Sequence, residues 1–235
     1  MDNNSLLVLK KDQTNEEKEK VPWWISRPYS LILKESFLSS HYEESILLTG
    51  IKSIDKFLGG GFHAGKIIEF VGEGGSGKTQ WVLTLTVQVL LNPPKSSRQY
   101  HVLYIHTKAA FPIKRWMDIL DGLTKYHSYK ETVAHDLRKK LERLLLCHIK
   151  TKDELWNIFV QNYKFIKENV KLLIIDSISD IFRPLYYDTD DERLFEVNVR
   201  ARFFLRFTKL INRIAVECNA FVILVNGVTQ DIEKR

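Results

Sequence analysis

The stretch that decides the fold is "VGEGGSGKTQ", residues 71–80. Within it, residues 72–79 fit the pattern G-x-x-x-x-G-K-[ST] of a phosphate-binding loop. The β-branched run "KIIEFVG" (66–72) comes before the loop, and "TQWVLTLTVQVLL" (79–91) after it has the length of a helix. A strand before the loop and a helix after it are the context that this pattern needs. The sequence therefore predicts a loop that holds the phosphates of a nucleotide.

Each residue type in this loop has a chemical reason to be there. Glycines allow backbone conformations that a Cβ forbids, so that consecutive N–H groups can point inward at phosphate oxygens. The helix that follows adds its positive N-terminal end. We expect Lys78 to reach the β- and γ-phosphates and Thr79 to offer its hydroxyl to Mg²⁺. The predicted ATP-binding residues are Gly72, Glu73, Gly74, Gly75, Ser76, Gly77, Lys78, Thr79 and Gln80.

A second predicted metal residue follows a buried strand. The string "LLIIDS" (172–177) places Asp176 after four apolar residues, where the strand is expected to end. A carboxylate at the carboxyl end of such a strand is the second group that organises Mg²⁺ in phosphate-loop proteins. The sequence therefore predicts a Mg²⁺ site between Thr79 and Asp176.

The rest of the chain predicts an α/β fold. Further apolar runs at 101–107, 171–177 and 220–227 predict strands, and the charge-rich segment 113–146 is expected to be helical. Near-continuous apolar strands separated by helices indicate a mostly parallel sheet with helices on both faces. We expect a polar, disordered tail over 1–20 and a docking arm or linker over 21–45, with Trp23 and Trp24 as partner contacts. The core is expected over 46–235.

Composition sets limits on the class of protein. The 235 residues are 44% hydrophobic and 27% charged, which is typical of a soluble globular domain. The formal net charge of +6 is compatible with nucleic acid, with an acidic partner protein or with a solvated surface. No apolar run has membrane-spanning length, so no membrane contact is expected. Cys147 and Cys218 are too few for a disulfide framework and predict reduced thiols, and the scattered histidines predict no zinc site.

Four blocks of sequence together resemble the RecA/RadA recombinase superfamily. The first is "LLTGIKSIDKFLGGGFHAGKIIEFVG" (47–72), with T-G-x-x-x-[LI]-D-x-x-L-G-G-G ahead of the phosphate loop and its trailing Gln80. The others are "HVLYIHTKAAFPIKRW", "LLIIDSISDIFRPLYY" and "RFTKLINRIAVECNAFVILVNGVT". The chain is most similar to the diverged eukaryotic recombinase paralogues. Residues 45–58 resemble the D-type paralogue, and "AFPIKR" is also similar to the cross-complementing group-three type.

The resemblance implies a role in homologous-recombination DNA repair. In this family ATP lies between adjacent subunits, and nucleotide state controls the grip on single-stranded DNA. Paralogues assist the loading and stabilisation of the recombinase filament. We therefore expect an ATP- and Mg²⁺-binding accessory subunit of a hetero-oligomeric recombination-mediator complex in the nucleus. Its expected partners are other recombinase paralogues, the recombinase filament and single-stranded DNA.

Two departures from the family pattern fall on the hydrolysis machinery. The family carries a water-orienting glutamate where this chain has Lys108, and a lysine cation cannot accept a proton from water. No carboxylate adjoins Lys108 in the sequence, which leaves His106 as a weak alternative base. The family also places a γ-phosphate-sensing glutamine where this chain has Gly227. We therefore expect at most a weak DNA-dependent ATPase. Family cores also continue past this point, so the chain is expected to be a shortened paralogue or a truncated one.

A basic stripe is the candidate DNA-binding surface. Arg202, Arg206, Lys209 and Arg213 fall on one face of a predicted helix, opposite a side expected to be buried. The expected buried residues are Phe203, Phe204, Phe207, Leu210, Ile211 and Ile214. Arg183 matches an arginine of the family's first DNA loop, although the acids of residues 188–192 would repel phosphate. Arg183, Arg202 and Arg206 are the predicted DNA contacts. A solvated face, salt bridges or contact with a partner protein would also explain the stripe.

Three other functions remain open at this point. The first is an active DNA-dependent ATPase that exchanges strands, against which Lys108 and Gly227 argue. The second is a pure scaffold with a vestigial nucleotide site. The third, an unrelated phosphate-loop kinase, fits poorly because no lid or acceptor-substrate motif stands out.

Overall fold

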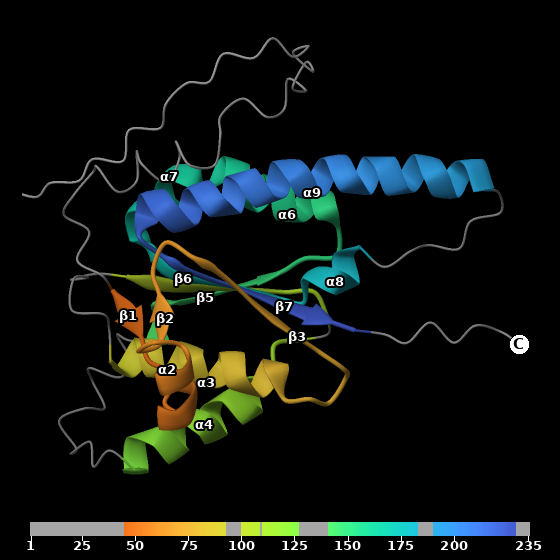
Figure 1. The fold of residues 1–235 in the computed structure, drawn as a ribbon. Helices are drawn as coiled ribbons and strands as arrows, with labels where there is room; N and C mark the ends of the chain where they lie inside the picture. Colours follow the sequence, from red (N-terminus) through yellow and green to blue (C-terminus); the bar gives the residue numbers. More distant parts are fainter. Residues whose placement is uncertain (1–44, 93–99, 109, 127–140, 183–189, 229–235) are drawn as a thin grey trace, which may run out of the picture. The chain divides into compact units, whose positions relative to one another are not determined.

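The computed structural model describes residues 45–92, 100–108, 110–126, 141–182 and 190–228. A five-stranded sheet forms the centre of this part of the chain (Figure 1). Its strands are β3 (Ile67–Gly72), β4 (His101–His106), β5 (Leu144–His148), β6 (Val170–Asp176) and β7 (Phe221–Gly227). They lie in the order β3-β7-β6-β4-β5, and every pair is parallel. The predicted fold class, a mostly parallel α/β sheet, is confirmed.

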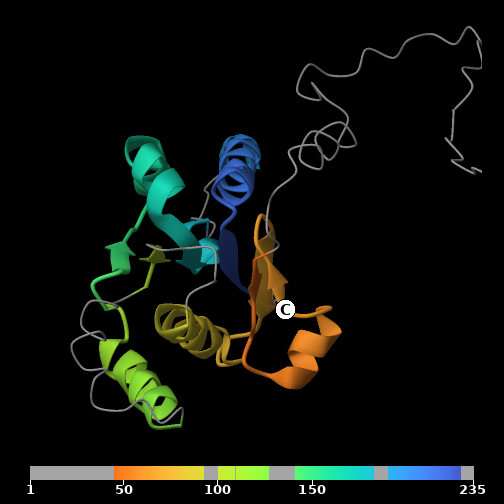
Figure 2. The ribbon, with the colours of Figure 1, turned by 90° about the vertical axis from the view of Figure 1, so that its left-hand side faces the viewer.

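Helices cover both faces of the sheet (Figures 1 and 2). One face carries α3 (Lys78–Leu91) and α4 (Ile113–Tyr126), and the other carries α6 (Lys152–Gln161), α7 (Tyr163–Asn169) and α9 (Asp190–Cys218). Successive strand residues alternate between two buried cores: Val102 and Tyr104 pack on the α3 side, whereas Leu103 and Ile105 pack on the α9 side. Because both faces are buried, the strands are apolar at nearly every position.

The segment before the phosphate loop forms a small separate sheet. Here β1 (Ile46–Leu47) pairs antiparallel with β2 (Phe62–His63), and α2 (Lys52–Phe57) lies between them in sequence. The Asp55 carboxylate Oδ1 accepts hydrogen bonds from the Thr49 backbone N–H and from the Thr49 hydroxyl, both at 2.7 Å. A Cβ on Gly61 would lie 2.7 Å from the Leu47 carbonyl oxygen, so glycine is needed there. These contacts explain the T-G-x-x-x-[LI]-D and triple-glycine pattern physically.

The structure corrects three sequence-based expectations. Residues 113–146 are not one helix, because α4 ends at Tyr126 and Leu144 begins the edge strand β5. The residues from Asp190 onward belong to the first turns of α9 and not to a loop. Phe204 is exposed, whereas Phe207, Ile211 and Ile214 are buried as expected. The predicted tail (1–20) and nearly all of the predicted docking arm (21–45) lie outside the described residues.

In the part of the chain that the structure describes, no helix combines the length and the apolar character needed to cross a membrane.

A candidate nucleotide site at the carboxyl edge of the sheet

The phosphate-binding loop connects β3 to α3. Strand β3 ends at Gly72 and helix α3 begins at Lys78. Gly75 and Gly77 have φ angles of +79° and +88°, a backbone conformation that side chains rarely adopt. The Lys78 ammonium folds back over the loop and donates to the carbonyl oxygens of Gly72, at 2.7 Å, and Glu73, at 2.6 Å. It also donates to the Ser76 hydroxyl at 3.1 Å, so the loop holds its own cation until a ligand competes for it.

A cavity of about 330 Å³ opens beside this loop. Six of the nine residues predicted to bind ATP line it: Gly74, Gly75, Gly77, Lys78, Thr79 and Gln80. The other three, Gly72, Glu73 and Ser76, accept hydrogen bonds from Lys78. Gln80 uses its side-chain Oε1 to accept from Arg115 Nε at 2.5 Å, which ties the start of α3 to α4.

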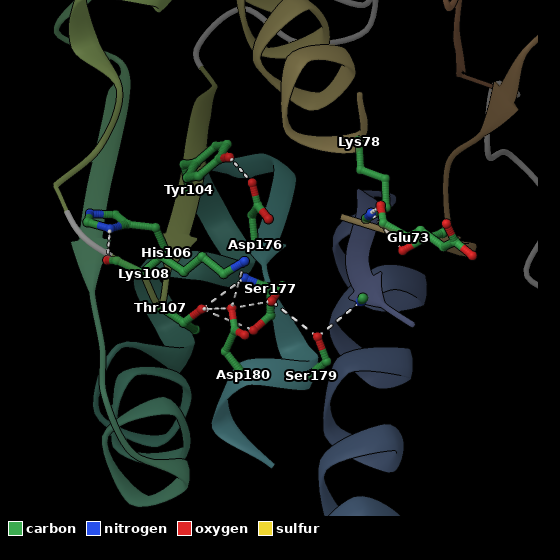
Figure 3. Close-up of polar contacts among 12 residues, drawn as sticks. Glu73, Lys78, Tyr104, His106, Thr107, Lys108, Asp176, Ser177, Ser179 and Asp180 are labelled. Atoms are coloured by element: carbon green, nitrogen blue, oxygen red, sulfur yellow. Dashed lines mark hydrogen bonds and ion pairs between the residues drawn. The ribbon is translucent and has the colours of Figure 1, made fainter. Parts of the chain in front are cut away.

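Asp176 faces the same cavity from the end of β6. It lines the cavity together with Thr79, so the structure brings the two predicted Mg²⁺ ligands to one site. The Tyr104 hydroxyl donates to Asp176 Oδ2 at 2.7 Å (Figure 3). Burial raises the pKa of Tyr104, and the neighbouring Asp176 carboxylate raises it further. The tyrosine is therefore protonated at neutral pH and can donate to Asp176.

An acid that the sequence pattern did not reveal lies close to Lys108. Asp180 lines the cavity from α8 (Ile178–Ile181), and its Oδ2 lies 3.7 Å from the Lys108 Nζ. The same carboxylate accepts from the Ser177 hydroxyl at 2.5 Å and from the Thr107 hydroxyl at 3.1 Å (Figure 3). The expectation that no carboxylate adjoins Lys108 therefore holds along the sequence but is wrong in space, because the ends of β4 and β6 are side by side.

The two positions that depart from the family pattern lie on opposite ends of one polar network. The Gly227 N–H donates to the Ser179 hydroxyl at 3.0 Å, and that hydroxyl lies 3.2 Å from the Ser177 hydroxyl. Ser177 then reaches Asp180 and so Lys108. His106, the alternative base, does not line this cavity; its ring stacks on His148 of β5 at 4.9 Å between centroids.

The arginines of the predicted DNA-binding surface lie in different environments. Arg202 and Arg206 line a second cavity, of about 520 Å³, between α6 and α9. The remaining lining residues are Lys152, Asp153, Trp156, Phe195, Val199 and Phe203. Arg213, from the same predicted stripe, instead donates to Glu217 at 2.6 Å and lies over the Tyr163 ring. The salt-bridge explanation therefore holds for Arg213, and Arg183 lies outside the described residues.

The residues at the first cavity fit a nucleotide with a divalent cation. The glycine-supported loop presents backbone N–H groups at the start of α3, and Lys78 adds a cation that only weak neutral acceptors hold. Thr79 and Asp176 supply the hydroxyl and carboxylate oxygens that Mg²⁺ prefers. Mg²⁺, when bound there, would neutralise phosphate charge. Such a set of residues suits the binding of polyphosphates. Each carboxylate in the described lining already accepts a hydrogen bond from a neighbouring donor, so none stands ready to accept a proton from water.

Some of these site residues could have been identified from the sequence pattern, and others could not. Tyr104 precedes the end of its strand by two residues, so it shares a strand face with His106 and could have been placed near Asp176. Asp180 lies four residues after Asp176, and one of its hydroxyl donors, Ser177, is also local, but the other donor, Thr107, is 73 residues away in the sequence. Nothing in the one-dimensional pattern reveals the groove between α6 and α9.

Comparisons with known proteins agree with this geometry. The family model described as Rad51 matches residues 43–235. The chain is 28% identical over 192 residues to "DNA repair protein RAD51 homolog 2" of Mus musculus, covering 81% of this chain and 53% of that protein. It is 25% identical over 193 residues to "DNA repair protein XRCC3 homolog" of Arabidopsis thaliana, covering 80% of this chain and 61% of the relative. A similar match, 25% over 199 residues, links it to "DNA repair protein RAD51 homolog 4" of Mus musculus, with coverages of 83% and 57%.

The chain thus spans between about half and three fifths of the length of these curated relatives. The matched segment contains the phosphate loop, Asp176 and both cavities. Since the family model covers most of the chain, the protein belongs to the Rad51 family of RecA/RadA-superfamily recombinases and recombinase paralogues.

Proposed function

We propose that the protein is an ATP-binding accessory subunit of a recombination-mediator complex that serves homologous-recombination DNA repair in the nucleus. The observation that carries the proposal is the composition of the first cavity. Six of the predicted phosphate-binding residues and both predicted Mg²⁺ ligands line it, whereas Lys108, paired with Asp180, follows the end of β4. In the described lining both aspartates already accept hydrogen bonds, which favours a subunit that holds nucleotide and turns it over slowly.

The neighbouring acid does not restore the missing base. A general base must accept a proton, and Asp180 already accepts two hydroxyl donors and faces a lysine cation. Both hydroxyl contacts fall on the Oδ2 oxygen, so an attacking water would have to compete with them for it. Gly227 offers only a backbone N–H, which Ser179 occupies. Weak or absent hydrolysis follows from both points.

The proposed partners are other recombinase paralogues and the recombinase filament. Support comes from the relatives, which are named as DNA repair proteins, and from the edges of the sheet. In the described part of the chain, β3 and β5 pair on one side only, and Val71 and Leu146 on them are 56% and 44% exposed. Unpaired strand edges with apolar side chains are surfaces that another chain can cover.

Single-stranded DNA is the proposed ligand of the groove between α6 and α9. Arg202 and Arg206 supply charge for phosphates, and Trp156 with Phe195 supplies rings on which bases can stack. Phe195 is 66% exposed, so its ring is open to a ligand. The N-terminal turns of α9 extend past α6 in Figure 1, and Phe195 and Val199 of these turns line the groove. Arg183 is proposed as a further contact on sequence alone.

The proposal is tested by titrating the purified chain with a fluorescent ATP analogue and Mg²⁺, comparing wild type with Lys78→Ala. Removing the lysine should weaken binding by roughly 10- to 100-fold, the effect of losing a charge-assisted hydrogen bond. Phosphate release should stay negligible with and without single-stranded DNA. Release that rises with DNA would restore the strand-exchange ATPase. Absence of binding, both alone and with a co-expressed paralogue, would leave the scaffold.

A further inference from the structure

A second lysine faces the phosphate-binding loop across the cavity. Lys108 follows the end of β4 and lines the same cavity as Lys78, Thr79 and Asp176. Among the described lining residues, Lys78 and Lys108 are the cations. Lys78 sits within the loop itself, whereas Lys108 comes from the opposite side, beside Asp176 (Figure 3). Phosphate groups entering the cavity would therefore meet a positive charge from two directions.

The contact that holds Lys108 is weak. Its Nζ lies 3.7 Å from Asp180 Oδ2, and the lysine side chain is 74% exposed. An exposed ion pair at this distance contributes little to stability, because water screens it and the long side chain loses freedom. Lys108 can therefore leave Asp180 at small cost when a stronger anion is available.

Asp180 does not depend on Lys108 for its position. Its carboxylate is only 13% exposed, and two hydroxyls donate to it, from Thr107 at 3.1 Å and Ser177 at 2.5 Å. The Thr107 hydroxyl also accepts from the Ser177 backbone N–H at 3.0 Å, which fixes the donor in turn. When Lys108 moves away, these donors still satisfy the partly buried carboxylate. Lys108 can therefore leave Asp180 while the hydrogen bonds to the Asp180 carboxylate remain.

We propose that Lys108 makes the cavity selective for nucleoside triphosphates over diphosphates, with Asp180 as the partner from which it is released. The inference rests on the proposed nucleotide binding and goes beyond it. The loop and Lys78 bind the phosphates that both ligands share. Lys108 adds a charge-assisted contact that requires the additional phosphate of the triphosphate. Each charge-assisted contact of this type changes affinity by roughly tenfold or more.

The exchange also connects two strand ends. Asp180 is linked through the Ser177 and Ser179 hydroxyls to the Gly227 N–H, at distances of 2.5, 3.2 and 3.0 Å (Figure 3). Lys108, at the end of β4, and Gly227, at the end of β7, therefore share one chain of hydrogen bonds. Moving the lysine cation at one end therefore changes the electrostatic field that acts on this series of hydrogen bonds.

The test measures equilibrium affinities for Mg²⁺-ATPγS and Mg²⁺-ADP with the full chain. Lys108→Ala should weaken ATPγS binding about tenfold and leave ADP binding within about twofold. Lys114→Ala, which removes an exposed lysine of α4 outside the cavity, should change neither affinity. Asp180→Asn, which removes the competing charge, should raise the ratio of ATPγS to ADP affinity. Lys108→Ala alone decides the question, since an exposed side chain can be truncated without disturbing the core.

The outcomes separate this inference from the proposal that it extends. Equal weakening of both nucleotides by Lys108→Ala, or no change in either, overturns the selectivity while nucleotide binding stands. Failure of the folded wild-type chain to bind either nucleotide overturns both. Loss of ATPγS affinity alone, with ADP unaffected, establishes Lys108 as the residue that distinguishes the two ligands.

Discussion

The Tyr104 hydroxyl donates a hydrogen bond to Asp176 Oδ2 at 2.7 Å, from one strand to its neighbour across the sheet. Tyr104 is 1% exposed, and its ring packs edge-on against Phe111 at 5.1 Å between centroids. The ring is therefore fixed, and the hydroxyl holds one carboxylate oxygen in place. Asp176 therefore faces the cavity in a defined orientation. A residue that hydrogen-bonds to a metal ligand and fixes its orientation tunes the metal affinity of the site.

Tyr104→Phe should weaken Mg²⁺ binding at the site. The substitution removes only the hydroxyl, so the core stays filled while Asp176 loses its orienting donor. Loss of such a supporting hydrogen bond lowers metal affinity by roughly 10- to 100-fold. The Mg²⁺ concentration for half-maximal nucleotide binding should rise by about the same factor in a titration at fixed ATP analogue.

Tyr100→Phe is the matched control for that experiment. Tyr100 is equally buried and donates to the Val89 carbonyl at 2.7 Å, but it does not line the cavity. Its variant loses the same atoms and should keep the wild-type Mg²⁺ dependence. A shift of equal size in both variants would mean that the core, and not Asp176, sets the metal affinity.

Lys108→Glu should increase phosphate release at saturating nucleotide. A carboxylate at this position can accept a proton from water, and the negative charge of Asp180 beside it raises its proton affinity. Positioned general bases contribute roughly 10²- to 10⁴-fold. Because Gly227 remains without a side chain, we expect a gain nearer tenfold, measured with single-stranded DNA present.

Lys108→Gln separates that effect from simple removal of a cation. Glutamine is similar in size to glutamate but has no basic carboxylate, so phosphate release by the Lys108→Gln variant should stay at the wild-type level. Equal rates for the Glu and Gln variants would show that the missing base does not limit hydrolysis in this chain.

Arg206→Ala should weaken binding of single-stranded DNA. The guanidinium lines the groove beside Trp156 and Phe203, where it can pair with one phosphate. Losing one phosphate contact reduces the slope of log affinity against log salt concentration by about 0.7 for a single strand. Fluorescence anisotropy with an oligothymidine over a range of salt concentrations measures this slope. Lys209→Ala removes an exposed charge of the same helix outside the groove and should leave the slope nearly unchanged if the groove is the contact.

Glu217 should make stability depend on pH. The Glu217 carboxylate accepts from Arg213 at 2.6 Å, and from Lys167 and Tyr163 at 2.9 Å. These contacts, with that of Arg213 the largest, lower the pKa of Glu217 to about 2. Since the folded-state pKa lies below the unfolded value of about 4.3, the contribution is complete above that value and is lost as pH falls towards 2.

The Glu217→Gln variant should therefore melt roughly 2–4 °C below wild type at pH 7, and the difference should shrink at pH 3. Glu168→Gln removes an exposed acid of α7 and provides the comparison. A difference that persists unchanged at pH 3 would mean that shape, and not charge, accounts for the loss.

The strands of the central sheet could be predicted because burial on both faces leaves nearly unbroken apolar runs. The phosphate loop could be predicted because its glycines, lysine and threonine act through local backbone geometry. Strand β5 could not, because its short run "LLLCH" lies at an edge and shows neither strict alternation nor full burial. The Lys108–Asp180 pair was equally hidden, since it depends on β4 and β6 being neighbours.

The phosphate loop relies largely on main-chain atoms: the Gly72 and Glu73 carbonyls hold Lys78, and Gly74, Gly75 and Gly77, which have no side chains, line the cavity. The two positions proposed to limit turnover depend instead on the side chain. Residue 108 carries a lysine side chain, and Gly227 carries none. Apart from proline, which lacks the N–H, all amino acids carry the same main-chain groups, so other substitutions compatible with the loop's backbone angles leave the cradle intact. A lineage can therefore lose catalysis in single steps while retaining its ligand, and retention of nucleotide in such a descendant says little about whether it still performs chemistry.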